Sequence, residues 1–289
     1  MCSTSSSART DPIESPVVLG VACPSFVDGP GVRSLVTLSG CPLDCRWCQH
    51  PAARKVSPDP VFDPARCLSC GSCARGDECL SRARRPAGES FAAETLAERI
   101  LRDRDWWEDR GRGQGGVTVT GGEPLLHASF LSRLCRLLRA EGVHIALETS
   151  LALAVPASAD LPEGIRSLAA AVDLWLVDLK HPDPAMYERF VGVSARVRDA
   201  NLDELASLGA AVAPRVVLVP GVIDTDDAID RLAAFCARRD FPSIEFVPYN
   251  PPPDAVGLDL PAEGLSPEGQ TRAISRFTDA LAGFTRSSR

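Results

Sequence analysis

The grouping of the cysteines is the feature that most restricts how this 289-residue chain can fold. Seven of its 11 cysteines fall within two short stretches, Cys41–Cys48 and Cys67–Cys79. Cysteines clustered in this way indicate metal binding or redox chemistry rather than disulfides when the protein resides in a reducing compartment. We therefore expect the chain to fold around metal centres as well as around an apolar core.

Composition narrows the class of protein. Apolar residues make up 45% and charged residues 24% of the chain, which is ordinary for a globular protein. The net charge of −7 argues against a nucleic-acid partner. No apolar stretch is long enough to span a membrane, and the Ser-rich residues 1–16 predict a disordered tail rather than a signal peptide. We expect a cytoplasmic protein with neither nucleic acid nor membrane as partner.

Short β-branched runs alternate with helical stretches from Val17 onward. This alternation predicts an α/β protein with a parallel sheet that curls into a barrel or partial barrel, helices on its outer face and chemistry at the carboxyl ends of the strands. The predicted strands are 34–38, 117–120, 144–149, 174–178, 215–219 and 244–247, and the predicted helices are 91–104, 129–141, 164–171, 199–208, 226–239 and 269–281.

Residues 50–87 interrupt this pattern, which leaves 17–49 and 88–289 for the barrel. The segment is rich in Pro, Arg, Cys and Gly and has no sustained period. Without a core of its own, it needs a metal to hold it together. Its cysteines Cys67, Cys70, Cys73 and Cys79 resemble half of a bacterial ferredoxin run. They predict an auxiliary [4Fe–4S] cluster with Cys79 as fourth ligand, and a tetrahedral zinc site is the alternative.

The first cysteine group follows the first predicted parallel strand. Cys41, Cys45 and Cys48 have the spacing C-x3-C-x2-C, and three thiolates can hold three irons of a [4Fe–4S] cluster. The fourth iron is then left open to a substrate. The alternatives are a zinc knuckle, which would need a fourth ligand that does not appear before Cys67, and a chance cluster of buried cysteines.

A family resemblance adds to these residues. The first cysteine group followed by Gly121-Gly122-Glu123-Pro124 resembles the radical S-adenosylmethionine (SAM) superfamily, and within it the glycyl-radical-enzyme activating enzymes of the pyruvate formate-lyase type. The resemblance covers residues 27 to about 250. It rests also on the stretches Val27–Arg33, Gly115–Val119, Val177–Lys180, Val191–Ser194 and Val219–Gly221.

The resemblance implies a partial (β/α)6 barrel of the radical SAM type and an oxidoreductase chemistry. SAM would chelate the open iron, and one electron from a reduced flavodoxin or ferredoxin would cleave it to methionine and a 5′-deoxyadenosyl radical. That radical would abstract a hydrogen atom from the substrate. The cofactors carry this reaction, and the protein positions them and excludes water.

Residues around SAM follow from the same resemblance. Gly121 and Gly122 let the backbone approach the ligand, and Glu123 would accept hydrogen bonds from the SAM ammonium, although the motif alone also suits a β-turn. Trp47 would pack near the cluster or the adenine, or else belong to the core. Asn250 follows the last strand, where the family commonly has His.

Further polar residues lie at the ends of the third and fourth predicted strands and at the start of the fifth. Glu148, Thr149 and Asp178 match positions that help bind a monovalent cation beside SAM, but Glu148 stands where the family has Asp. Lys180 and Arg215 match positions near SAM, with surface ion pairing as the alternative.

Three functions remain open from the sequence. The chain activates a glycyl radical enzyme, with Asp28 beside the docked glycine loop of that protein. Alternatively it acts on a small molecule, for example as an epimerase with a Cys hydrogen donor. Three observations favour this second function: Asn250 stands where the family has His, the Gln49-His50 pair is unusual for the family, and the composition is Arg-rich. The third is a non-catalytic iron–sulfur carrier. The intact Gly121-Gly122-Glu123 motif argues against it, because a carrier needs no SAM site.

Overall fold

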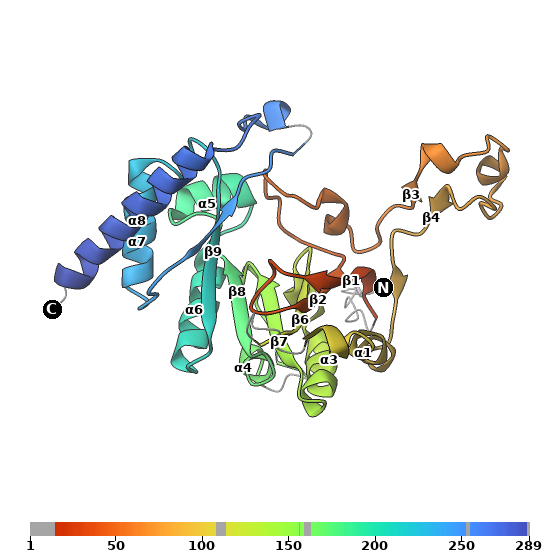
Figure 1. Cartoon of the computed structure of the whole chain (residues 1–289), viewed down its shortest axis with the longest axis horizontal. Coiled ribbons are helices and arrows are strands. Elements are labelled where there is room, and N and C mark those ends of the chain that lie inside the picture. Colours follow the sequence, from red (N-terminus) through yellow and green to blue (C-terminus); the bar gives the residue numbers. More distant parts are fainter. Residues whose placement is uncertain (1–14, 108–113, 156, 159–162, 253–254, 288–289) are drawn as a thin grey trace, which may run out of the picture.

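The fold is built on one eight-stranded sheet (Figure 1). The computed structural model describes residues 15–107, 114–155, 157–158, 163–252 and 255–287. The strand order is β10-β9-β8-β7-β6-β2-β1-β5, and β10 and β5 form the two open edges. The strands are β1 (Val17–Ser25), β2 (Arg33–Leu38), β5 (Glu89–Ser90), β6 (Gly116–Gly121), β7 (His144–Thr149), β8 (Leu174–Asp178), β9 (Val212–Leu218) and β10 (Glu245–Pro248).

The six predicted parallel strands are confirmed. They are β2, β6, β7, β8, β9 and β10, each parallel to its neighbour. The structure adds β1, which pairs antiparallel with β2, and the short β5, which pairs antiparallel with β1. The predicted tail of residues 1–16 falls largely outside the described residues, and β1 begins directly after it.

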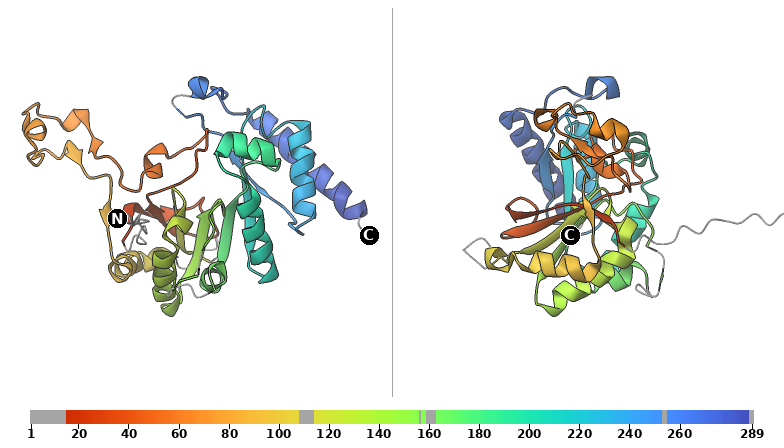
Figure 2. Two further views of the ribbon diagram at one scale, coloured as in Figure 1. Left: turned by 180° about the vertical axis from the view of Figure 1, so that it is seen from behind. Right: turned by 90° about the vertical axis from the view of Figure 1, so that its right-hand side faces the viewer.

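Helices cover the outer side of the sheet (Figures 1 and 2). The predicted helix over 91–104 is divided in two at Arg102 and Asp103, and a helix that the sequence analysis missed, α5, follows β8. Asp183 caps α5 by accepting hydrogen bonds from two backbone amides, and Pro184 occupies its first turn. The helices are α1 (Ala93–Leu101), α2 (Arg104–Trp107), α3 (Ala128–Ala140), α4 (Ile165–Ala169), α5 (Pro184–Val191), α6 (Arg196–Ser207), α7 (Asp226–Ala237) and α8 (Pro267–Ser287).

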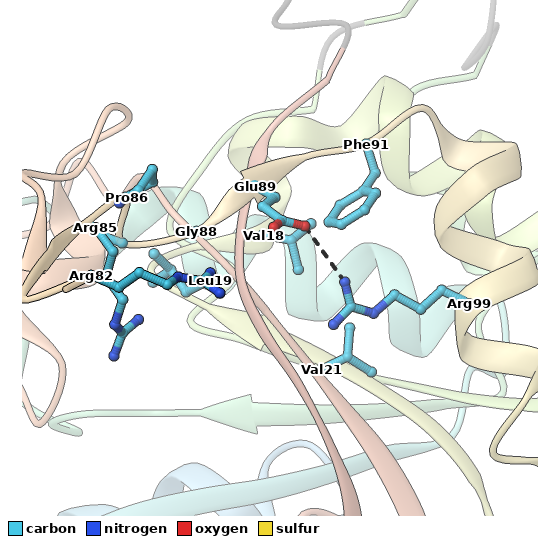
Figure 3. Close-up of a pocket in the computed structure, with 11 residues that line it drawn as sticks. Val18, Leu19, Val21, Arg82, Arg85, Pro86, Gly88, Glu89, Phe91 and Arg99 are labelled. Carbon is cyan, nitrogen blue, oxygen red and sulfur yellow. Dashed lines mark ion pairs between the residues drawn. The ribbon is translucent and has the colours of Figure 1, made fainter. Parts of the chain in front are cut away.

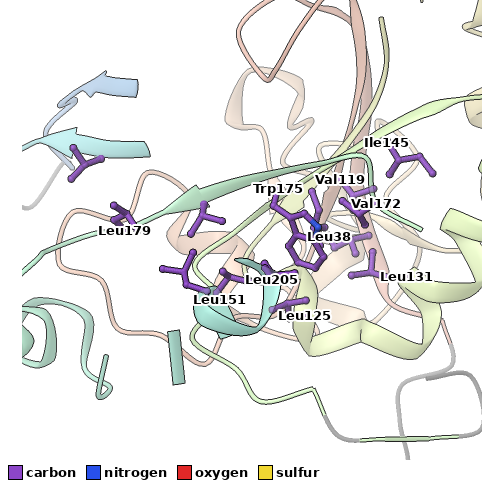
Figure 4. Packing of buried hydrophobic residues seen from close by; sticks show 14 of the residues in the cluster. Leu38, Val119, Leu125, Leu131, Ile145, Leu151, Val172, Trp175, Leu179 and Leu205 are labelled. Atoms are coloured by element: carbon purple, nitrogen blue, oxygen red, sulfur yellow. The ribbon is translucent and has the colours of Figure 1, made fainter. Parts of the chain in front are cut away.

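The main core lies between the sheet and these helices (Figure 4). Leu38, Val119 and Trp175 project from three of the strands, and Leu131 of α3 and Leu205 of α6 meet them from the helices; all five are fully buried. In the described part of the chain, none of the helices combines the length and the apolar character needed to cross a membrane.

The Cys-rich segment forms an arm that projects from the sheet (Figure 1). Its only regular pairing within the described residues is a two-stranded sheet of β3 (Val61–Phe62) and β4 (Arg84–Arg85). Its first turn, Pro51–Arg54, instead lies against the barrel, because Gly40 and Cys41 donate backbone hydrogen bonds to Ala53 and Arg54.

Candidate active site

The first cysteine loop follows β2 at the carboxyl edge of the parallel strands. Two backbone hydrogen bonds fix it to the end of α5, from Asp44 to Val191 at 2.8 Å and from Arg46 to Phe190 at 2.9 Å. Leu43 fills a small apolar cluster with Tyr187 and Val191, against which Cys41 and Cys45 pack. The helix that sequence reasoning missed thus holds the loop in place.

Burial controls the protonation of these cysteines. It raises the pKa of Cys41, and it raises the pKa of Cys45 to about 11 against the opposing effect of the nearby Lys180 ammonium. Across the described residues, no three His, Cys, Asp or Glu side chains gather closely enough to hold one metal ion. The fit to a cluster therefore rests on the donors: three thiols in one loop beside a cation that favours their thiolate form.

Gly121 and Gly122 bring the end of β6 into close contact with this loop. Gly122 donates to the carbonyl of Leu38 and Glu123 to that of Gly40, at 3.0 and 2.9 Å. A Cβ atom on Gly122 would lie 2.3 Å from the Gly40 carbonyl oxygen, so only glycine fits here. In this structure the close neighbour of these glycines is the cysteine loop, and their approach to SAM stays a prediction.

Glu123 is almost fully buried, and its carboxylate joins the ends of β6 and β7. Thr149 Oγ1 (2.6 Å) and the Leu125 amide (3.2 Å) donate to Oε1, and the Ser150 amide (2.9 Å) and hydroxyl donate to Oε2. An ionised carboxylate has about four acceptor positions, and these four donors fill them. Ser150 was missed by sequence reasoning, although it directly follows Thr149.

Asp178 and Lys180 form an ion pair at the end of β8. Burial alone would lower the pKa of Lys180, but Asp178 and Cys45 raise it above its ordinary value. Asp178 Oδ1 and the Tyr187 hydroxyl are both buried and, among the described residues, have no hydrogen-bond partner. Buried polar atoms without partners at a strand end are suited to a ligand that supplies the missing hydrogen bonds.

Arg215 and Glu148 form a second ion pair beside the first. Arg215 Nη1 lies 3.1 Å from Glu148 Oε1, and its Nε lies 2.9 Å from Glu245 Oε2. Burial raises the pKa of Glu148, which Arg215 counteracts. Asn250 is exposed, and its carbonyl accepts a hydrogen bond from Gln49. Gln49 and Asn250, which both depart from the family pattern, therefore contact each other.

The loop that carries Asp28 is anchored to the strands. Arg33 Nε donates to Thr118 Oγ1 at 2.6 Å, and Thr118 Oγ1 donates to the Asp28 carbonyl at 2.5 Å. Ser25 donates to the Asp28 carboxylate. The Asp28 charge contributes to the raised pKa of Glu148, so the loop lies within electrostatic reach of the residues at the strand ends.

Trp47 is buried in the main core, where its ring packs on Phe190 at 5.4 Å between centroids. Next to it, a cavity of about 400 Å³ opens between the cysteine loop and the segment after β10, with Cys45, Cys48, Arg46 and Leu258 in its lining. The arm cysteines are more open: Cys67, Cys70 and Cys73 are exposed, and Cys79 is half-buried.

Comparison with known proteins decides the family. The model of the radical SAM superfamily matches residues 35–236. The chain belongs to the radical SAM superfamily. An indoleacetate decarboxylase activating enzyme from Tractidigestivibacter scatoligenes is 31% identical over 264 residues, which cover 77% of this chain and 79% of that enzyme. A pyruvate formate-lyase 2-activating enzyme from Escherichia coli is 37% identical over 198 residues, which cover 68% of this chain and 64% of that enzyme.

The fold agrees with this assignment. The structure of Streptococcus suis SuiB bound to the precursor peptide SuiA matches 84% of this chain and 44% of SuiB, with a TM-score of 0.57 at 14% identity. This radical SAM chain is therefore an enzyme whose family uses a [4Fe–4S] cluster and SAM. Its relatives favour the activating-enzyme alternative over a small-molecule epimerase.

When bound, the cluster and SAM supply a 5′-deoxyadenosyl radical that abstracts a hydrogen atom. The protein's own part is positional. The loop contacts to α5 hold Cys41, Cys45 and Cys48, the Glu123 hydrogen bonds fix the ends of β6 and β7, and the Lys180–Asp178 pair places a cation beside Cys45.

Proposed function

We propose that this chain is a glycyl-radical-enzyme activating enzyme, which abstracts a hydrogen atom from one glycine of a partner protein. The observation that carries the proposal is the pair of activating-enzyme relatives reported above, one of which matches more than three quarters of both chains. The anchored Asp28 loop supports it, because Thr118 of β6 holds the Asp28 backbone against the sheet and the Asp28 charge acts on Glu148.

The site residues take the following roles in this proposal. Cys41, Cys45 and Cys48 bind the SAM cluster, and SAM lies against Gly121, Gly122, Asp178, Lys180 and Arg215. The open acceptor on Asp178 supports its place beside the ligand. Trp47, Thr149, Glu148 and Asn250 line or support the same site.

Glu123 is then a positioning residue through its side chain. Its acceptor positions are occupied by Thr149, Ser150 and Leu125, so its carboxylate acts on SAM by holding the strand ends rather than by accepting from the SAM ammonium.

Residues 50–87 form a separate module in this proposal, inserted between the barrel segments 17–49 and 88–289. Its four cysteines hold an auxiliary [4Fe–4S] cluster. A reduced flavodoxin or ferredoxin donates the electron. The exposed cysteines on a projecting arm support this arrangement.

The test uses the reconstituted enzyme with SAM, dithionite and a glycyl radical enzyme encoded near its gene. We expect 5′-deoxyadenosine and a glycine-centred radical on the partner, detected by electron paramagnetic resonance. Asp28→Ala should abolish the radical on the partner and spare SAM cleavage. Asp28→Asn, which can still accept from Ser25, is the control that separates charge from loop structure. SAM cleavage without any radical on the partner would contradict the proposal.

A further inference from the structure

Three arginines of the arm are left without acidic partners. The other basic side chains of the arm are paired, as in Lys55–Asp59, Arg66–Asp63 and Arg75–Asp77. Arg82, Arg84 and Arg85 are exposed and, among the described residues, form no ion pair. We call these three residues the arginine cluster. Glu78 is the one arm carboxylate left over, and it balances only one of the three charges.

Arg82 and Arg85 of the arginine cluster lie where the arm meets the edge of the sheet (Figure 3). Arg82 and Arg85 line a pocket of about 250 Å³, whose other wall is formed by Val18 and Leu19 of β1. Arg99 reaches the same pocket but is engaged by Glu89, 3.7 Å away, and lies over the ring of Phe91. The free positive charge of the pocket therefore comes from Arg82 and Arg85.

Charge is separated between the arm and the barrel. Residues 50–87 contain seven Lys or Arg and four Asp or Glu, a net charge of +3 within a chain of net charge −7. The rest of the chain therefore carries −10. An acidic protein is repelled by the barrel and attracted to the arm, and at ordinary ionic strength such fields act over about 8–10 Å.

Apolar side chains lie beside the arginines. Phe62 of β3 pairs with Arg84 of β4, and Phe62 is 55% exposed. Leu80, two residues before Arg82, is 87% exposed. Apolar residues next to unpaired arginines are typical of protein interfaces rather than of plain solvated surface.

The arginine cluster is also joined to the second cysteine group. The Arg84 amide donates a hydrogen bond to Cys79 Sγ at 3.4 Å. A protein that docks on the arginine cluster would stand next to the cysteines proposed to hold the auxiliary [4Fe–4S] cluster.

We propose that the arginine cluster, with Phe62 and Leu80, docks an acidic one-electron carrier protein. The inference rests on the proposed function, which needs one electron for each SAM cleaved. The carrier would lose that electron, and the auxiliary [4Fe–4S] cluster proposed for the arm would accept it. Small, charge-steered interfaces suit such transient redox encounters.

The test compares two variants with the same change in net charge. One carries Arg82→Glu, Arg84→Glu and Arg85→Glu. The control carries Arg196→Glu, Arg238→Glu and Arg272→Glu, three exposed arginines on the barrel side of the molecule. The probe is an acidic plant-type ferredoxin, with an acidic flavodoxin as a second arm. Binding is measured by titration calorimetry at low and high salt, and SAM cleavage is driven either by the reduced carrier or by dithionite.

We expect the arm variant to bind the carrier about tenfold more weakly and to lose most of the salt dependence of binding. Its carrier-driven SAM cleavage should fall in parallel, while its dithionite-driven cleavage stays at the wild-type rate. The barrel variant should match the wild type in all four measurements.

Equal losses in both variants would overturn the proposal, because net charge alone would then explain them. Binding of the carrier by the arm variant at the wild-type affinity would also overturn the proposal. So would an arm variant that binds the carrier normally but no longer binds the glycyl radical enzyme, because the arginine cluster would then be the docking surface for that enzyme. Failure of dithionite-driven cleavage in the wild type would instead refute the proposed function.

Discussion

In the barrel, Trp175, Tyr187 and Leu131 are fully buried, whereas in the arm the apolar side chains of Leu68 and Leu80 are 72% and 87% exposed. Both regions carry a cysteine group, but only the barrel has an apolar core that can position its group without help. Burial of a large apolar side chain contributes about 1.5–3 kcal/mol to folding, and the arm gains little from this source. The barrel should therefore keep its structure without metal, and the arm should not.

The largest expected effect is on iron and on the structure of the arm. We expect roughly 8 Fe in the reconstituted enzyme and about half that in a variant with Cys41→Ala, Cys45→Ala and Cys48→Ala. A variant with Ala at Cys67, Cys70, Cys73 and Cys79 should also keep about half, but its arm should be cut by trypsin at Arg66, Arg75 and Arg82 while the barrel resists.

Iron analysis and timed proteolysis check this expectation. The first variant is the matched control, since it loses a cluster from the region that has a core and its arm should stay protected. About 4 Fe in the wild type together with bound zinc would contradict the auxiliary cluster. If the arm resisted trypsin equally well in both variants, its fold would not depend on the metal.

The next effect contrasts a buried carboxylate with an exposed one. Glu123→Ala removes the acceptor for four buried donors and should lower the free energy of unfolding by about 3 kcal/mol. Asp77→Ala breaks the exposed Arg75–Asp77 pair of the arm and should change it by less than about 1 kcal/mol. Urea denaturation measures both variants.

SAM binding sharpens the same contrast. Because Glu123 holds the ends of β6 and β7, Glu123→Ala should also weaken SAM binding, and Glu123→Gln, which retains one acceptor oxygen, should weaken it less. Unchanged stability with lost SAM binding would mean that the carboxylate contacts SAM directly, as the sequence alone suggested.

The outcome for individual residues shows what pattern can predict. The strands His144–Thr149 and Leu174–Asp178 were predicted to the residue, because buried parallel strands form short apolar runs. The strand β1 and the helix α5 were missed, since only Val18 of β1 is buried and α5 has only eight residues.

The site was harder to predict than the fold. Motif and spacing point to Glu123 and Thr149 separately, but their hydrogen bond joins residues 26 apart in the chain. The contacts of Tyr187 with the cysteine loop likewise depend on how α5 packs. Such tertiary contacts leave no local pattern in the sequence.

The smallest expected effect is a pH dependence that belongs to the barrel alone. Burial lowers the pKa of His127, His144 and His181, and none of the three lies in the arm. His127 Nε2 is held by the Ser39 carbonyl at 2.6 Å, and His181 Nδ1 accepts from the Asp183 amide at 3.0 Å. Because burial outweighs these hydrogen bonds, protonation costs more in the folded chain than in the unfolded chain.

The sign follows from this difference. Below the unfolded-state pKa of about 6.5, the unfolded chain binds more protons, so stability falls as the pH drops. Each histidine removes up to about 1.4 kcal/mol between pH 7.5 and 5.5. Urea midpoints of the barrel should decrease over this range, and His127→Gln should remove part of the decrease. The rate at which trypsin cleaves the metal-loaded arm should be the same at both pH values, after correction for the pH dependence of trypsin itself. A barrel whose stability is constant or rises toward pH 5.5 would show that these histidines are free to protonate in the folded state.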